Sequence, residues 1–275
     1  MNNKRIKILL ISLFLLLKLN IYAQGDLLVT PYRVIFEDGK TFKEVSIANT
    51  GKDTARYVID FVQYKMNENG VLEQIGDQDS NSYYFASKYL RIFPRSVILA
   101  PNDAQVVRLQ VRTPPDIKPG EYRSHLYFRS VPIEKPLGIK KDEADSTLSV
   151  RLIPVYGLSI PVIIRIGNLN VNVNVKDAKL DLKEKPVLNI TITRNGEKST
   201  FGDIEVEYIN KDNPPIKVGN IRSIAIYTPL NQRKISLPLN IDEKIDYKQG
   251  MLKISYVSSG SSKKETYFDY LYNLE

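Results

Sequence analysis

Apolar and polar residues alternate along most of the chain after residue 24, and β-branched residues recur at the apolar positions. A period of two is the pattern of strands with one buried face, whereas helical spacing is hard to find in this region. In the first half the pattern predicts strands at 27–30, 33–36, 41–49, 54–65, 90–93, 96–99, 104–111, 120–131 and 147–165. In the second half it predicts strands at 169–175, 187–193, 202–209, 221–228, 234–239, 250–257 and 265–272.

Turn-forming sequences separate these segments, for example Asn-Glu-Asn-Gly at 67–70 and Arg-Asn-Gly-Glu at 194–197. Strands at this spacing are typical of all-β sandwiches. We place a domain boundary within Arg-Ile-Gly-Asn at 165–168, which gives an N-terminal domain at 24–165 and a C-terminal domain at 166–275. The prediction is an all-β chain of two antiparallel sandwiches in tandem.

The N-terminus has the features of a secretory signal peptide. A basic stretch at 4–7 precedes an apolar run at 8–17, and the small residue Ala23 supplies a cleavage position. Because Lys18 interrupts the run, it is too short to span a bilayer core of roughly 30 Å as a helix. We predict that residues 1–23 are a signal peptide and that the mature protein is exported without stable membrane insertion. An uncleaved membrane anchor is the alternative.

Charge and cysteine content exclude several classes of function. Without the four basic residues of the signal peptide, 35 basic and 31 acidic residues remain, a net charge of +4. These charges are scattered, so we expect no nucleic-acid partner. The chain contains no cysteine. The domains must therefore be stabilised by core burial without disulfides, and thiol nucleophiles and cysteine-ligated zinc are absent.

No combination of residues indicates catalysis. The one histidine, His125, is expected on a strand, at a surface or in a polar pair. The neighbouring carboxylates Asp142-Glu143 and Asp242-Glu243 lie in stretches that read as solvated turns. There is no nucleophile elbow, phosphate loop or dinucleotide fingerprint. We predict a protein that is not an enzyme, with no catalytic residue, no metal site and no cofactor.

Several sequence stretches, in this order, resemble a known family. In the first half these are 28–36 (LVTPYRVIF), 46–51 (SIANTG), 90–101 (LRIFPRSVILAP), 105–109 (QVVRL) and 119–132 (PGEYRSHLYFRSVP). The second half adds 221–229 (IRSIAIYTP) and 250–254 (GMLKI). Their order and spacing are similar to those of the PapD-like periplasmic chaperones of pilus and fimbrial subunits. The resemblance covers nearly all of the mature chain and is most specific in its first half.

The resemblance implies two immunoglobulin-like β-sandwich domains and a periplasmic chaperone for pilus assembly and fimbria biogenesis. Its partners would be pilus or fimbria-like subunits, together with an outer-membrane assembly protein. Arg33 would be the anchor for the subunit's C-terminal carboxylate. The family pairs this arginine with a lysine, but the corresponding position, near Ser159, has no basic residue around it. Either Arg33 works with another arginine, or the anchor differs in this chain.

The run at 147–165 is the candidate donor strand. Every second residue of this run is apolar. The apolar positions in its N-terminal half form the predicted donor face, Leu148, Val150, Leu152 and Pro154. An exposed apolar edge is a template for another chain, as in donor-strand complementation. Alternatively, the run is a long core strand that bridges the domains. The rival function for the whole protein is an exported β-sandwich adhesion or binding module.

Overall fold

The computed structural model describes residues 27–37, 39–76, 84–132, 155–210, 214–260 and 264–274. Within these ranges nearly all regular structure is β-strand, and the helical element described is the short 3-10 helix η2 (Ala86–Tyr89). The predicted all-β fold is confirmed. The predicted signal peptide (1–23) and the predicted donor face (Leu148, Val150, Leu152 and Pro154) lie outside the described residues.

The first sandwich contains strands β1 (Leu27–Thr30), β2 (Val34–Phe36), β3 (Phe42–Asn49), β4 (Ala55–Met66), β5 (Leu72–Ile75), β6 (Leu90–Phe93), β7 (Ser96–Leu99), β8 (Ala104–Val111), β9 (Gly120–Val131) and β10 (Gly157–Ile166). One sheet has the order β1-β3-β8-β6. The facing sheet has the order β2-β10-β9-β4-β5, and β7 also pairs with β4. In the usual letters, β1, β3, β8 and β6 are strands A, B, E and D, and they face β10, β9 and β4, which are strands G, F and C. This is the strand order of an immunoglobulin-like sandwich.

A tyrosine corner supports the same assignment. Tyr122 lies near the start of β9, the F strand, and its hydroxyl donates to the backbone oxygen of Lys118 at 2.9 Å. Its ring stacks on Tyr84 with ring centroids 4.9 Å apart and meets the edge of Tyr89. Such a tyrosine, bonded back to the chain just upstream, is a feature of immunoglobulin-like sandwiches.

The second sandwich contains β11 (Val171–Asp181), β12 (Val187–Gly196), β13 (Thr200–Ile209), β14 (Ile216–Ile226), β15 (Gln232–Pro238), β16 (Met251–Ser258) and β17 (Thr266–Asn273). Sheet β11-β12-β15 faces sheet β14-β13-β16-β17, and every neighbouring pair is antiparallel. This corresponds to A-B-E facing C′-C-F-G, a common variant of the same architecture. The predicted tandem of two immunoglobulin-like sandwiches is confirmed.

Alternating side chains build a separate core in each sandwich. Along β16, for example, every second residue is buried, because successive side chains of a strand point to opposite faces. One core joins apolar residues between Val29 and Ile164, and the other joins residues between Val173 and Leu274. Each fully buried large side chain stabilises its sandwich by about 1.5–3 kcal/mol. Both domains can therefore be held together without a disulfide.

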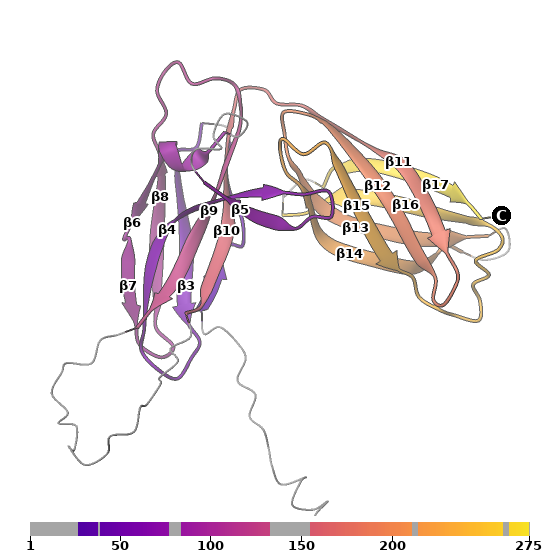
Figure 1. The fold of residues 1–275 in the computed structure, drawn as a ribbon, viewed down its shortest axis with the longest axis horizontal. Coiled ribbons are helices and arrows are strands. Elements are labelled where there is room, and N and C mark those ends of the chain that lie inside the picture. Colours follow the sequence, from indigo (N-terminus) through magenta and orange to yellow (C-terminus); the bar gives the residue numbers. More distant parts are fainter. Residues whose placement is uncertain are drawn as a thin grey trace, which may run out of the picture.

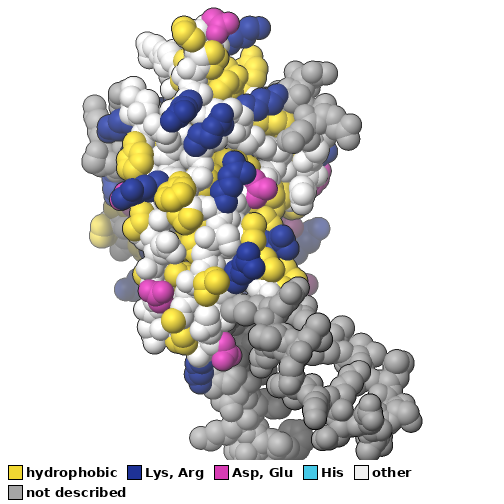
Figure 2. Space-filling view, turned by 90° about the vertical axis from the view of Figure 1, so that its left-hand side faces the viewer, with side chains coloured by type: hydrophobic (Ala, Val, Ile, Leu, Met, Phe, Trp, Pro, Cys, Tyr) yellow, Lys and Arg dark blue, Asp and Glu magenta, His cyan; other side chains and the backbone are white. Residues whose placement is uncertain are grey.

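The two sandwiches lie side by side with their long axes inclined to each other (Figure 1). The chain passes from β10 to β11 at the upper end of this view, and the β4–β5 hairpin extends from the first sandwich toward the second. The first sandwich's face away from the second is shown in Figure 2. Lysine and arginine side chains are spread there among apolar ones, rather than gathered into one basic patch.

Candidate binding site between the two sandwiches

The outer face of the sheet containing β2, β10 and β9 is covered by the second sandwich. Ile163 of β10, Ala225 of β14 and Tyr227 just after β14 form a buried apolar cluster. Ile35, Met66 and Phe201 pack against it. This second apolar face explains why β9 is buried continuously from Gly120 to Leu126, where a strand with one free face would alternate.

Arg33 lies in this interface, immediately before β2. Its Nη2 donates to the hydroxyl oxygen of Tyr227 at 2.9 Å. The centre of its guanidinium is 3.8 Å from the ring centroid of Phe201 and 5.3 Å from that of Tyr227. Burial lowers the pKa of Arg33 from its ordinary value, but a guanidinium remains charged at neutral pH. The predicted carboxylate anchor is therefore a cation enclosed by aromatic groups of the other sandwich.

A second arginine lies against the same tyrosine. Arg123 is on β9, and the centre of its guanidinium is 4.2 Å from the ring centroid of Tyr227. Its Nη2 donates to the backbone oxygen of Tyr64 at 3.0 Å. The sequence contained no signal for this role, because Arg123 meets Tyr227 only when the two domains pack together. The structure thus brings another arginine to the ring that Arg33 contacts.

The position near Ser159 does not contribute to this cluster. Ser159 is on β10, opposite Tyr127 of β9. Strand β2 begins to pair with β10 at Val162, three residues further along. The nearest described basic residue on β10 is Arg165, which binds carboxylates of its own domain, Glu121 and Glu37.

His125 is not at a surface or in a polar pair, so the expectation for it was wrong. It is 1% exposed, and neither ring nitrogen has a hydrogen-bond partner. Its ring meets Tyr64 edge-on, with centroids 4.9 Å apart, and Tyr227 at 6.3 Å. Burial, together with the nearby charges of Arg123 and Arg33, lowers the pKa of His125 to about 3. The imidazole is therefore neutral at physiological pH and acts as an aromatic packing group.

A buried carboxylate links the domains beside this cluster. Glu121 of β9 accepts hydrogen bonds from Arg165 Nε at 3.1 Å and from the backbone N–H of Ser199 at 3.1 Å. The Ser199 hydroxyl also donates to Glu121, and Thr228 Oγ1 lies 3.5 Å from it. Ser199 and Thr228 belong to the second sandwich, so one carboxylate bonds to both domains.

The β4–β5 hairpin makes another contact across the interface. The backbone oxygen of Glu68, at its tip, accepts from the N–H of Lys234 in β15 at 2.7 Å. The two side chains also pair, with Lys234 Nζ 2.8 Å from Glu68 Oε2. Gly70 lies so close to Arg233 that a Cβ there would clash with the guanidinium. The hairpin tip therefore covers part of the edge of β15.

A cavity of about 410 Å³ opens between the domains on the Arg123 side. Both sandwiches contribute to its wall: Tyr64, Tyr84, Phe85, Pro119, Gly120, Glu121, Arg123, Arg194, Gly196, Glu197, Thr228 and Pro229. Arg33 and Phe201 are not among these residues. The open volume of the cleft thus reaches one of the two arginines at Tyr227.

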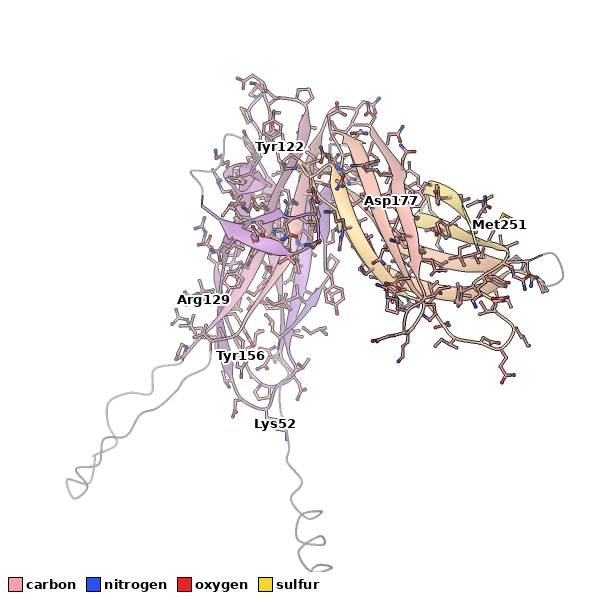
Figure 3. All side chains as sticks on the ribbon, turned by 45° about the vertical axis from the view of Figure 1, so that its right-hand side comes forward. Lys52, Tyr122, Arg129, Tyr156, Asp177 and Met251 are labelled. Carbon is pink, nitrogen blue, oxygen red and sulfur yellow. The ribbon has the colours of Figure 1, made fainter. Side chains whose placement is uncertain are left out.

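Among the described strands, the N-terminal half of β10 has a partner on one edge only. It pairs with β9 along its whole length, but β2 pairs only with Val162–Ile164. No described strand pairs with the other edge of residues 157–161. The residues just before the strand, Val155 and Tyr156, are exposed. Figure 3 shows Tyr156 and Arg129 in the part of the first sandwich away from Tyr122, between Tyr122 and Lys52.

The alternation of apolar residues predicted for 147–165 is seen in the part of this segment that the structure describes. Ile160, Val162 and Ile164 are buried in the core of the first sandwich, and Leu158 packs against them. The predicted donor-face residues at 148–154 share this parity, but they lie outside the described residues. Whether they complete another chain therefore stays a prediction.

The described residues provide no metal-binding or membrane-spanning element. None of their His, Asp and Glu side chains form a group of three that could hold a metal ion. Within the same ranges, no helix has the length and apolar character needed to span a bilayer.

No protein-family model and no curated protein matches the chain. Solved structures similar to it include the YadV chaperone, at 12% identity and a TM-score of 0.47, covering 90% of this chain and 100% of that one. The class 5 fimbriae chaperone CfaA has 17% identity, a TM-score of 0.43 and coverages of 90% and 98%. The CupB2 chaperone of Pseudomonas aeruginosa has 10% identity, a TM-score of 0.44 and coverages of 90% and 100%. At these values none of them decides what this chain does.

Proposed function

We propose that this protein is an exported, non-enzymatic chaperone that captures pilus or fimbria-like subunits in the periplasm by donor-strand complementation. The observation that carries the proposal is the open edge of β10 at residues 157–161. An unpaired edge offers backbone N–H and C=O groups to an added strand. In the sequence, the predicted donor face, Leu148, Val150, Leu152 and Pro154, lies just before this edge.

Two further features support the proposal. The sequence motifs that resemble PapD-like chaperones lie on the strands that build this sandwich, β1 to β3 and β6 to β9. In addition, Arg33 and Arg123 place two guanidinium groups at the interface between the domains. Guanidinium groups bind carboxylates through charge-assisted hydrogen bonds, so this interface suits a subunit's C-terminus.

The test is reconstitution of a one-to-one complex from the mature chain (24–275). We would co-express it with immunoglobulin-like subunits that lack their last strand, purify the complex and measure its affinity. Arg33→Ala is expected to leave the protein folded and to weaken capture by at least about tenfold, because an unpaired carboxylate stays desolvated in the cleft.

The matched control is Arg129→Ala, since Arg129 is an exposed arginine on β9 outside the interface. It should bind like the unmodified protein. If no subunit forms a complex, the chaperone function is wrong and the binding-module alternative leads. If a complex forms and Arg33→Ala binds it unchanged, only the assignment of the anchor is wrong.

A further inference from the structure

The guanidinium of Arg33 is already occupied within the chain. Tyr227 accepts its hydrogen bond, and the rings of Phe201 and Tyr227 contact its charge. These three contacts come from the second sandwich. A ligand that binds Arg33 through Nη2 must therefore displace the hydroxyl of Tyr227.

Arg33 is half-buried, and the second sandwich covers the side of its guanidinium that faces Tyr227 and Phe201. Ile163, Ala225 and Tyr227 form a buried apolar cluster in the same interface, and the cavity of the cleft is lined by Arg123 and not by Arg33. Apolar clusters of this kind exclude water and resist the entry of a charged group. The face of Arg33 that Tyr227 and Phe201 cover becomes accessible only when the second sandwich moves away.

Contacts on either side of the cluster hold the sandwiches together. Glu121 bonds to Ser199 on one side, and the hairpin tip bonds to β15 through Glu68 and Lys234 on the other. Neither contact involves Arg33, so both can persist or break independently of what it binds. They contribute to the free energy that an opening movement must overcome.

A carboxylate is a suitable replacement for the hydroxyl of Tyr227 as the acceptor of a hydrogen bond from Arg33. The hydroxyl of Tyr227 offers Arg33 one neutral oxygen, whereas a carboxylate offers two oxygens that share a negative charge. With a carboxylate both partners are ionised and two parallel hydrogen bonds can form, so the pair is stronger than the bond of a guanidinium to a neutral hydroxyl. A carboxylate can therefore replace the tyrosine hydroxyl once the interface has separated.

Resting on the proposed function, we propose that Tyr227 occupies Arg33 in the free chaperone, in place of the subunit's terminal carboxylate. Capture of a subunit then requires the two sandwiches to separate at Tyr227. The free protein is a closed form whose anchor is held by its own second domain, and Tyr227 is the residue that positions it.

The test measures access to Arg33 in the free protein, without any subunit. Phenylglyoxal modifies accessible guanidinium groups, and mass spectrometry gives the rate at each arginine. In the unmodified protein we expect Arg33 to react at least about tenfold more slowly than the exposed Arg129 in the same molecule. Tyr227→Phe keeps the ring but removes the acceptor. It should speed the reaction at Arg33 by about tenfold, the effect of losing a hydrogen bond to a charged group.

Tyr247→Phe is the matched control, because its hydroxyl donates to Asn240 within the second sandwich, away from Arg33. It should leave the rate at Arg33 unchanged. Equal rates at Arg33 and Arg129 in the unmodified protein would overturn the closed form. The same holds if Tyr227→Phe leaves the rate at Arg33 unchanged.

Subunit capture separates this inference from the function on which it rests. If the free form is closed, Tyr227→Phe should bind a subunit about tenfold more tightly, because less free energy is needed to open the cleft. Capture with unchanged affinity would overturn the role of Tyr227 and leave the chaperone function standing. Protection of Arg33 without capture of any subunit would support the closed contact while refuting the chaperone function.

Discussion

The ring of Tyr227 contacts two guanidinium groups of the other sandwich, one from Arg33 just before β2 and one from Arg123 on β9. A cation over an aromatic face gains about 0.5–1 kcal/mol at an exposed site and about 2 kcal/mol when desolvated. Such contacts offset part of the cost of burying Arg33 and Arg123 close together. The neighbouring His125 is held neutral first by its burial, which lowers its pKa, and then by Arg123 and Arg33, which disfavour a third cation beside them.

This neutral histidine predicts a dependence of stability on pH. The pKa of His125 is about 3 in the folded protein, whereas an unfolded histidine titrates near its ordinary value of about 6.5. As the pH falls below about 6.5, the unfolded chain takes up a proton that the folded chain refuses. The free energy of unfolding should therefore fall, by at most about 1.4 kcal/mol per pH unit, until the pH approaches 3.

Urea denaturation at pH 7, 5.5 and 4 would measure this effect. His125→Phe keeps an aromatic ring at the position and removes the titrating group, so it serves as the reference. The difference between the two proteins should change steadily from pH 7 to pH 4. Parallel pH profiles would show that His125 does not titrate differently on unfolding.

Of the four side chains that meet at the domain interface (Arg33, Arg123, His125 and Tyr227), the sequence pointed only to Arg33. Arg33 stood out because it precedes a short apolar strand in a recognisable motif. Arg123 and Tyr227 also lie in motifs, but nothing in their local pattern indicates that they meet, since the contact crosses the domain interface. His125 was misjudged for the same reason, because part of its burial comes from Tyr227 of the second sandwich, which the local sequence pattern does not show.

At the scale of elements, β10 has two parts with different surroundings. Its C-terminal half, Val162–Ile164, lies between β2 and β9, whereas residues 157–161 pair with β9 alone among the described strands. The strand thus continues the core of its own sandwich at one end and presents an edge at the other. This arrangement allows one strand to serve both as core and as donor.

The donor role predicts a contrast between two adjacent residues. Val150→Asp places a charge on the predicted donor face, where a subunit's apolar groove would have to accommodate it, and should abolish capture. Ser149→Asp adds the same charge on the opposite face of the same run and should retain capture. Pull-down of a purified subunit would compare the two. Equal binding by both variants would argue against an alternating donor face.

Most strands followed from alternation, and the differences have local causes. Strands β6 to β9 have the predicted bounds, because each alternates clearly between two turns. Strand β5 (Leu-Glu-Gln-Ile) was not predicted, since four residues with two polar ones carry little pattern. Strand β14 begins at Ile216 rather than at 221, because two register shifts interrupt its alternation opposite β13.

At the scale of the whole molecule, Glu121 couples the two sandwiches. Its side chain is completely buried and bonds to Arg165 on one side and to Ser199 on the other. Glu121→Ala leaves Arg165 with Glu37 as its remaining carboxylate and removes the bonds across the interface. We expect a loss of about 2–3 kcal/mol in the free energy of unfolding, as for other hydrogen bonds to charged groups.

Glu44→Ala is the matched control for this change. Glu44 forms an ion pair with Arg108 in which both side chains are at least half exposed, so its loss should cost less than about 1 kcal/mol. Urea denaturation of both variants would test the difference. A similar small loss for each would mean that the buried carboxylate contributes no more than a surface pair.

The hairpin tip over β15 has a consequence for the order in which the protein folds. Domains generally fold as units while the chain is synthesised, starting from the N-terminus. The β4–β5 hairpin is therefore in place before β15 has been made. When β15 emerges, the oxygen of Glu68 is ready to accept the N–H of Lys234. The first domain thus acts as a preformed template for an edge of the second, which shortens the time for which that edge could pair with another nascent chain.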